Sequence, residues 1–242
     1  MTARHATRSR RFAAASVLAA SAISGTVLAA SGTDSSSRAE ATTPVVAGFD
    51  SSGHGMGGMH NRHVSARIKL YTTMRSLWNQ HMEWTWSTVV AFATDSPALP
   101  ATLDRLLANQ ADIGNAVATF YGVKAGDQLT ALLTTHITQA VPVLQAAKAG
   151  DQAALDEALD DWYANAQDIA DFLSRANPRN WHRDAMREMM MTHITQTTAY
   201  ASAVLSGDYQ GAIATYDQAQ AHMSDMVDTL SSGIIAQFHR KF

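Results

Sequence analysis

The sequence predicts an all-α fold: an up-and-down bundle of about six antiparallel helices, built from three helical-hairpin repeats. Three observations lead to this prediction. From residue 64 onward, apolar residues recur every three or four positions, helix-breaking residues interrupt them at regular intervals, and parts of this region match one another. The chain of 242 residues also has only 5 Pro and 14 Gly and is rich in Ala, which favours helices over strands.

Residues 1–30 are typical of an export signal. Four arginines (Arg4, Arg8, Arg10 and Arg11) precede an Ala-rich apolar stretch that ends on small residues. Several serines make this stretch too weakly apolar for a good membrane anchor. Its removal leaves 18 − 4 = 14 basic against 21 acidic side chains, a net charge of −7. We therefore expect a secreted protein, extracellular or in the cell envelope, with no stable membrane span and no nucleic-acid partner.

Residues 31–63 are predicted to be a disordered linker, because a segment rich in Ser, Thr and Gly cannot bury enough apolar surface to fold. Its end, residues 54–63, combines His54, Met56, Met59, His60 and His63 with several glycines. Imidazole and thioether groups on a flexible backbone can bind a soft metal such as copper. The simpler interpretation is a linker with incidental histidines, and the spacing fits no rigid site.

Six helices follow, separated by pairs or clusters of turn residues. The predicted ranges are 64–95, 99–121, 127–148, 152–175, 182–205 and 209–238. Asp127, Asp151 and Asp208 stand where N-caps or first-turn acids are expected. Since the connections are short, neighbouring helices should run antiparallel.

The helices also resemble one another in sequence. Leu132–Gln139 matches Met189–Gln196, and Ala108–Ile113 matches Ala164–Ile169. Looser copies occur at Trp78–Met82 and Gln218–Met223. Three hairpins of about 56 residues explain these matches.

Each helix carries one polar residue at a matched position next to its apolar stripe. These residues are His81, Asp112, His136, Asp168, His193 and His222. The midpoint between every consecutive pair falls on or beside a predicted turn, so in an up-and-down bundle all six lie at one level. We therefore expect a buried layer of His and Asp side chains.

Neutral imidazoles and ionised carboxylates are typical ligands of copper, iron, manganese or zinc, and bundle metal sites are built from side chains that project inward from several helices. The layer therefore predicts a transition-metal site, formed by a subset of the six residues or holding two neighbouring ions. Asn109, Asn165, Asp171 and Asp225 flank it as possible partners that orient the imidazoles, although ordinary polar helix surface is the simpler interpretation.

Two other interpretations remain. The layer could be a metal-free network of hydrogen bonds in a structural or interaction protein, or the pocket of an enzyme that uses the same metal. Cysteine is absent, which excludes disulfides and thiolate ligands, and the sequence has no phosphate loop, dinucleotide fingerprint or HExxH motif.

Five stretches carry a resemblance to a known family: Leu107–Asn115, Ala125–Leu133, Trp162–Asn165, Ala176–Pro178 and Gly233–Phe238. From about Leu70 to Phe242 the chain resembles exported helical proteins of Gram-positive bacteria. The resemblance implies a helical fold and export. Some members of that family carry the automatic name glycosyltransferase, but this sequence has neither an α/β pattern nor a DxD-type motif to support that activity.

Overall fold

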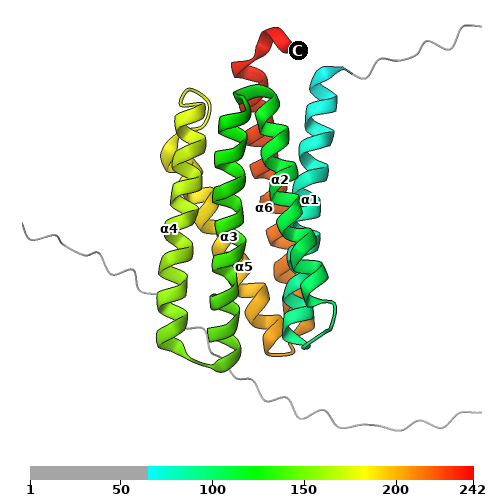
Figure 1. Cartoon of the computed structure of the whole chain (residues 1–242), viewed down its shortest axis with the longest axis vertical. Helices are drawn as coiled ribbons and strands as arrows, with labels where there is room; N and C mark the ends of the chain where they lie inside the picture. Colours follow the sequence, from blue (N-terminus) through cyan, green and yellow to red (C-terminus); the bar gives the residue numbers. More distant parts are fainter. Residues whose placement is uncertain (1–64) are drawn as a thin grey trace, which may run out of the picture. The chain divides into compact units, whose positions relative to one another are not determined.

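The predicted all-α bundle is confirmed. A computed structural model describes residues 65–242 and contains six helices, α1 (Ala66–Ala93), α2 (Leu99–Tyr121), α3 (Val123–Ala149), α4 (Gln152–Ala176), α5 (Arg183–Leu205) and α6 (Tyr209–Gln237), with a 3-10 turn η1 (His239–Lys241) (Figure 1). The expected export signal, the linker and the His/Met segment 54–63 lie outside the described residues.

The predicted helix ends agree with the structure within about two residues except at the start of α3. This helix begins at Val123 rather than 127, because the chain turns on the single residue Gly122, whose φ of +86° strongly favours glycine. Asp127 therefore lies inside α3 and is no N-cap. Asp151 and Asp208 do act as caps, and each accepts a hydrogen bond from a backbone N–H three residues on.

The helices follow one another around the bundle, and α6 closes it against α1 (Figure 1). Helix α5 lies further inside, since it contacts α1 and α3 in addition to its neighbours α4 and α6. Met186, Met190, Ile194, Tyr200 and Val204 of α5 are all buried. His193 lies on this buried face of α5, and the opposite face, which includes Met191, is exposed.

Helices α2 and α3 approach closely because glycines face each other at their crossing. A Cβ atom on Gly114 would lie 2.7 Å from the carbonyl oxygen of Gly126 and would also collide with Thr130. A Cβ atom on Gly126 would lie 2.7 Å from the carbonyl oxygen of Gly114. Backbone atoms cannot move aside as a flexible side chain can, so these two positions require glycine.

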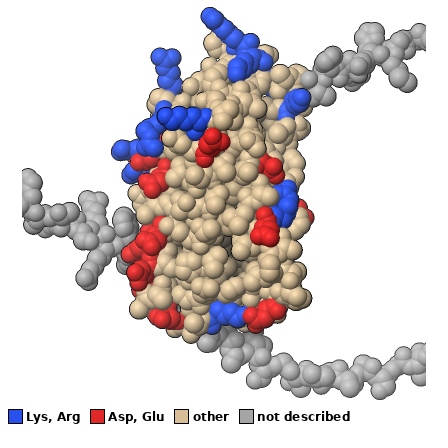
Figure 2. Space-filling model, in the orientation of Figure 1, with Lys and Arg blue, Asp and Glu red and all other residues tan. Residues whose placement is uncertain are grey.

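Charged side chains lie on the outside of the bundle. Figure 2 shows Lys and Arg mainly toward one end of the viewed face, Asp and Glu mostly along its edges, and a central part with neither. Among residues 65–242, no helix combines the length and the apolar character needed to cross a membrane.

Replacement of Gly114 by Ala should destabilise the domain by about 1–3 kcal/mol, because the added methyl group overpacks the α2–α3 crossing. Elsewhere in a helix the same change stabilises by up to about 1 kcal/mol. The measurement is the free energy of unfolding in urea. Asn115→Ala, at the exposed neighbouring position, is the control and should change it by less than about 0.5 kcal/mol. Equal effects of the two substitutions would show that the crossing tolerates a side chain.

Candidate functional site

Three of the six predicted site residues come together in the interior. The side chains of His81 on α1, His136 on α3 and His193 on α5 are 2%, 2% and 4% exposed. The imidazole of His193 lies between the other two, with ring centroids 5.8 Å from His81 and 5.7 Å from His136. We call these three residues the histidine cluster.

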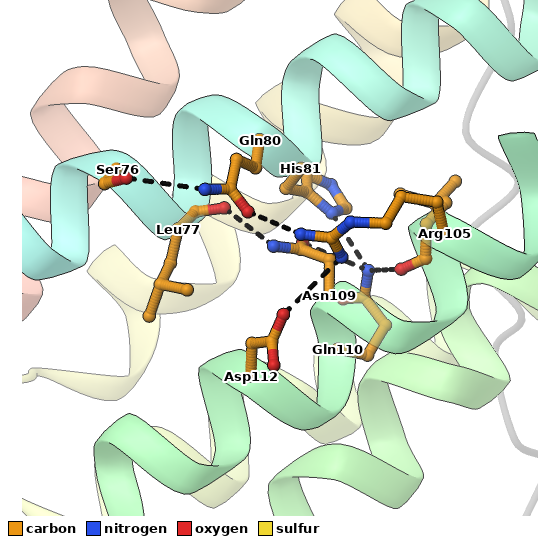
Figure 3. Close-up of polar contacts among 9 residues, drawn as sticks. Ser76, Leu77, Gln80, His81, Arg105, Asn109, Gln110 and Asp112 are labelled. Atoms are coloured by element: carbon orange, nitrogen blue, oxygen red, sulfur yellow. Dashed lines mark hydrogen bonds and ion pairs between the residues drawn. The ribbon is translucent and has the colours of Figure 1, made fainter.

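The expectation that both aspartates point inward is wrong. Asp112 is exposed, and its carboxylate lies 3.5 Å from Arg105 on the same helix (Figure 3). Asp168 is exposed as well. The residues that follow them, Ile113 and Ile169, take the inward positions. Successive side chains of an α-helix point in directions roughly 100° apart, so the aspartates point away from the interior. A carboxylate in this interior would meet no buried cation, so the outward orientation avoids a large desolvation cost.

His222 lies at the edge of the interior. It is half-buried, and its Nε2 lies 2.9 Å from the backbone carbonyl oxygen of Met189. A carbonyl can only accept, so Nε2 carries the proton and donates. His222 therefore contacts the helix of His193, and its other nitrogen faces away from that hydrogen bond.

The same contact recurs in all three hairpins. The second helix of each hairpin donates a side-chain hydrogen bond to the carbonyl oxygen four residues before the buried histidine. The pairs are Asn109 to Leu77 at 3.0 Å (Figure 3), Asn165 to Leu132 at 3.2 Å and His222 to Met189 at 2.9 Å. These bonds fix each pair of helices in register.

The sequence interpretation of the flanking residues needs a correction. Asn109 and Asn165 are buried, at 0% and 5% exposure, and are not ordinary helix surface. Asp171 and Asp225 are outside the cluster, and Asp171 forms a two-bond ion pair with Arg187. Gln110, which the sequence analysis did not single out, is also fully buried. Gln110, Asn165 and His222 each follow a cluster histidine (His81, His136 and His193, respectively) by 29 residues. This constant separation is the sequence signal that could have identified them.

Asn165 fixes the tautomer of His136. Its amide nitrogen donates to the carbonyl of Leu132, so its Oδ1 is the atom 3.0 Å from His136 Nδ1 and must accept. His136 Nδ1 therefore carries the proton, and Nε2 keeps a free lone pair. Metal-binding histidines are commonly oriented in this way, by a hydrogen bond from the other ring nitrogen.

The two remaining imidazoles differ from His136. The amide nitrogen of Gln110 donates to the carbonyl of Leu106 at 2.7 Å and lies 3.4 Å from His81 Nδ1, so this ring nitrogen accepts and Nε2 is protonated (Figure 3). His193 Nδ1 is buried and has no hydrogen-bond partner among the described residues. An unpaired buried nitrogen of this kind costs free energy unless something binds it.

The histidine cluster forms one end of a partly enclosed cavity between α1, α2, α3 and α5. The cavity has a volume of about 60 Å³, enough for a few water molecules or an ion with a small ligand. It continues past Thr197 and Ala201 to Leu205, a rise of roughly 18 Å along α5 from His193. Apart from the histidines its wall is formed by apolar, Thr and Ser side chains, with no acidic or basic residue among those described.

The cluster is uncharged at neutral pH. Burial lowers the pKa of His81 to about 3, with a smaller contribution from His136 nearby. Burial also lowers the pKa of His136 to about 4, against the opposing effect of its hydrogen bond to Asn165. The pKa of His193 lies well below the usual value, because of burial first and then the neighbouring histidines. All three rings thus present neutral nitrogens, the protonation state in which imidazole binds metals.

The cluster is close to, but not in, the arrangement of a metal centre. Among residues 65–242, no three His, Asp or Glu side chains are grouped so that they could hold an ion as they stand. Two imidazoles bound to one ion at about 2.0–2.1 Å have ring centroids roughly 5.2–5.5 Å apart. The observed 5.7 and 5.8 Å exceed this by a few tenths of an ångström, and these two distances join His193 to His136 and to His81.

No protein-family model, curated protein or solved structure matches the chain. The histidine cluster and its cavity are therefore the features that bear on function.

The domain should lose stability as the pH falls below about 6.5, the usual pKa of histidine in an unfolded chain. In the folded state the pKa values of His81 and His136 are lower, so between pH 6.5 and 4 the unfolded chain binds more protons and acid favours unfolding. Each such histidine contributes up to about 1.4 kcal/mol per pH unit.

Urea unfolding at pH 7.5, 6.0 and 5.0 measures this effect. His81→Leu removes one buried base without leaving a cavity, so its unfolding midpoint should fall less steeply with acid. The exposed residues His182 and His239 provide the matched control, and their replacement by Ala should leave the steep dependence unchanged. A midpoint that does not move between pH 7.5 and 5.0 would contradict the assignment of neutral buried rings.

Proposed function

We propose that this chain is an exported protein that binds a transition metal through the histidine cluster and serves in metal capture, storage or delivery. The observation that carries the proposal is the burial of three neutral imidazoles side by side, one of them with an unpaired ring nitrogen. Imidazole is a good ligand for copper, zinc and iron. A bound ion would satisfy His193 Nδ1, the histidine nitrogen that is buried without a partner among the described residues.

The three rings contribute differently to the proposed site. His136 has the suitable tautomer already, with Nε2 free and Nδ1 held by Asn165. His193, between the other two rings, has an Nδ1 with no hydrogen-bond partner among the described residues, and this nitrogen would bind the ion. His81 must exchange its Nε2 proton for one on Nδ1, which requires the Gln110 amide to turn. We therefore assign His136 and His193 as the principal ligands and His81 as the ligand that completes the set.

Export and repeat origin belong to the same proposal. The arginine-rich start followed by an apolar stretch supports export, as does the resemblance to exported helical proteins. The equivalent hydrogen bonds of Asn109, Asn165 and His222 support an origin of the domain from three hairpin repeats. The segment 54–63 would then serve as an arm that collects metal before it enters the bundle.

A second candidate is the binding of a small apolar molecule, because the cavity that adjoins the cluster is lined mainly by apolar side chains. In that case the imidazoles would hydrogen-bond a polar group at one end of the ligand. Native mass spectrometry of the purified chain separates the two candidates, since it reports whether a metal or an organic molecule remains bound.

The metal content of the purified chain tests the proposal. The native chain should retain about one transition-metal ion per bundle, and the double variant His136→Ala/His193→Ala should lose it. Two controls remove equal or larger numbers of histidines elsewhere: His182→Ala/His239→Ala on the surface and His54→Ala/His60→Ala/His63→Ala in the arm. Both controls should retain the bundle ion. Equal metal content in the native chain and the double variant would refute the site.

A further inference from the structure

We infer that the ion held by the histidine cluster is monovalent copper, Cu(I), rather than a divalent ion. The inference rests on the proposed metal-binding function and specifies its ligand. Among residues 65–242, the interior of the bundle carries no charged side chain that could compensate a divalent ion. Within the described part of the chain, the buried polar side chains are His, Asn, Gln, Thr and Ser, and no Asp, Glu, Lys or Arg is buried.

No negatively charged side chain of the described residues would compensate the charge of a metal ion bound in this cluster. The two carboxylates that could have balanced a divalent ion, Asp112 and Asp168, are on the surface, where Asp112 pairs with Arg105. Neutral imidazoles donate electron pairs but no negative charge. The desolvation cost of an ion rises steeply with its charge, so an uncompensated divalent ion is far less favourable here than a monovalent one.

The number of donors leads to the same ion. The cluster offers two or three ring nitrogens, and the adjoining cavity adds only Thr and Ser hydroxyls among mostly apolar groups. Zinc in proteins takes four ligands in a tetrahedron, and iron and manganese favour carboxylate or water oxygens in larger sets. Cu(I) accepts two or three soft or borderline donors and needs no water.

Buried methionines lie close to two of the cluster histidines along the chain. Met82 directly follows His81 and is fully buried, and Met190 lies one turn before His193 on the same helix. On the side of Met190, a second small cavity is lined by Met74, Met190 and Met226 with aliphatic and Trp side chains. The mainly apolar wall of the cavity beside the cluster would disfavour oxidation to the divalent ion, which prefers a more polar site.

The test is a pair of anaerobic titrations of the full chain, one with Cu(I) and one with Zn(II), each against a coloured chelator of known affinity. We expect one Cu(I) per bundle, bound at least about 100-fold more tightly than Zn(II). His136→Leu/His193→Leu should abolish this binding, while His182→Ala/His239→Ala should not. X-ray absorption of the copper complex should show two or three nitrogen neighbours.

Asn165→Leu provides a variant that keeps all three imidazoles. It removes the acceptor that holds the proton on His136 Nδ1, and loss of such a supporting group weakens metal binding by about 10–100-fold. This variant should therefore bind Cu(I) more weakly, with circular dichroism confirming an intact helical fold. Unchanged Cu(I) affinity in folded Asn165→Leu would overturn the role of His136 as a ligand.

The titrations also distinguish a failure of the inference from a failure of the proposed function. If Zn(II) binds as tightly as Cu(I), and this binding is lost in the His136→Leu/His193→Leu variant, the choice of Cu(I) is wrong. The proposed metal site would still hold in that case. If neither metal depends on these two histidines, or if copper is held only by the arm 54–63, both proposals are wrong.

Discussion

The structure depends on the burial of three uncharged imidazoles in the middle of an apolar bundle. Each ring must give up water, and the bundle compensates two of them with amide groups from the neighbouring helix, Asn165 for His136 and Gln110 for His81. His193 Nδ1 receives no such compensation. Of the three imidazoles, the one between the other two is thus the ring whose Nδ1 has no hydrogen-bond partner among the described residues, and this is the feature on which the proposed site depends.

The position of α5 explains why His193 is buried beside two other imidazoles. Because α5 contacts four other helices, its residue His193 is buried and lies between the imidazoles of His81 and His136. The side chains of Asn109, Asn165 and His222 hold the hairpins in register through backbone carbonyls. These bonds keep the histidines at one level, while the cavity beside them leaves room for the rings to turn.

The absence of buried charge in residues 65–242 has opposite consequences for stability and for function. It spares the fold the cost of an unpaired carboxylate, and it makes the interior sensitive to acid, since each proton that enters would be an uncompensated charge. The same property would select among the ligands that we propose, because the interior tolerates little charge of either sign. Stability below neutral pH and the ion that we propose therefore depend on one feature of the bundle.

The sequence by itself determined the helices, their ends to within about two residues at most positions, and the common level of His81, His136 and His193. Those features depend on local periodicity, turn residues and the fixed rise of a helix, all of which can be counted along the chain. Only the tertiary structure decided which polar residues face inward. Asp112 and Ile113 are adjacent in sequence, yet one is exposed and the other buried, because the rotation of α2 is set by its packing against α1 and α3. The central position of α5 likewise arises from contacts between distant segments, and no local pattern encodes it.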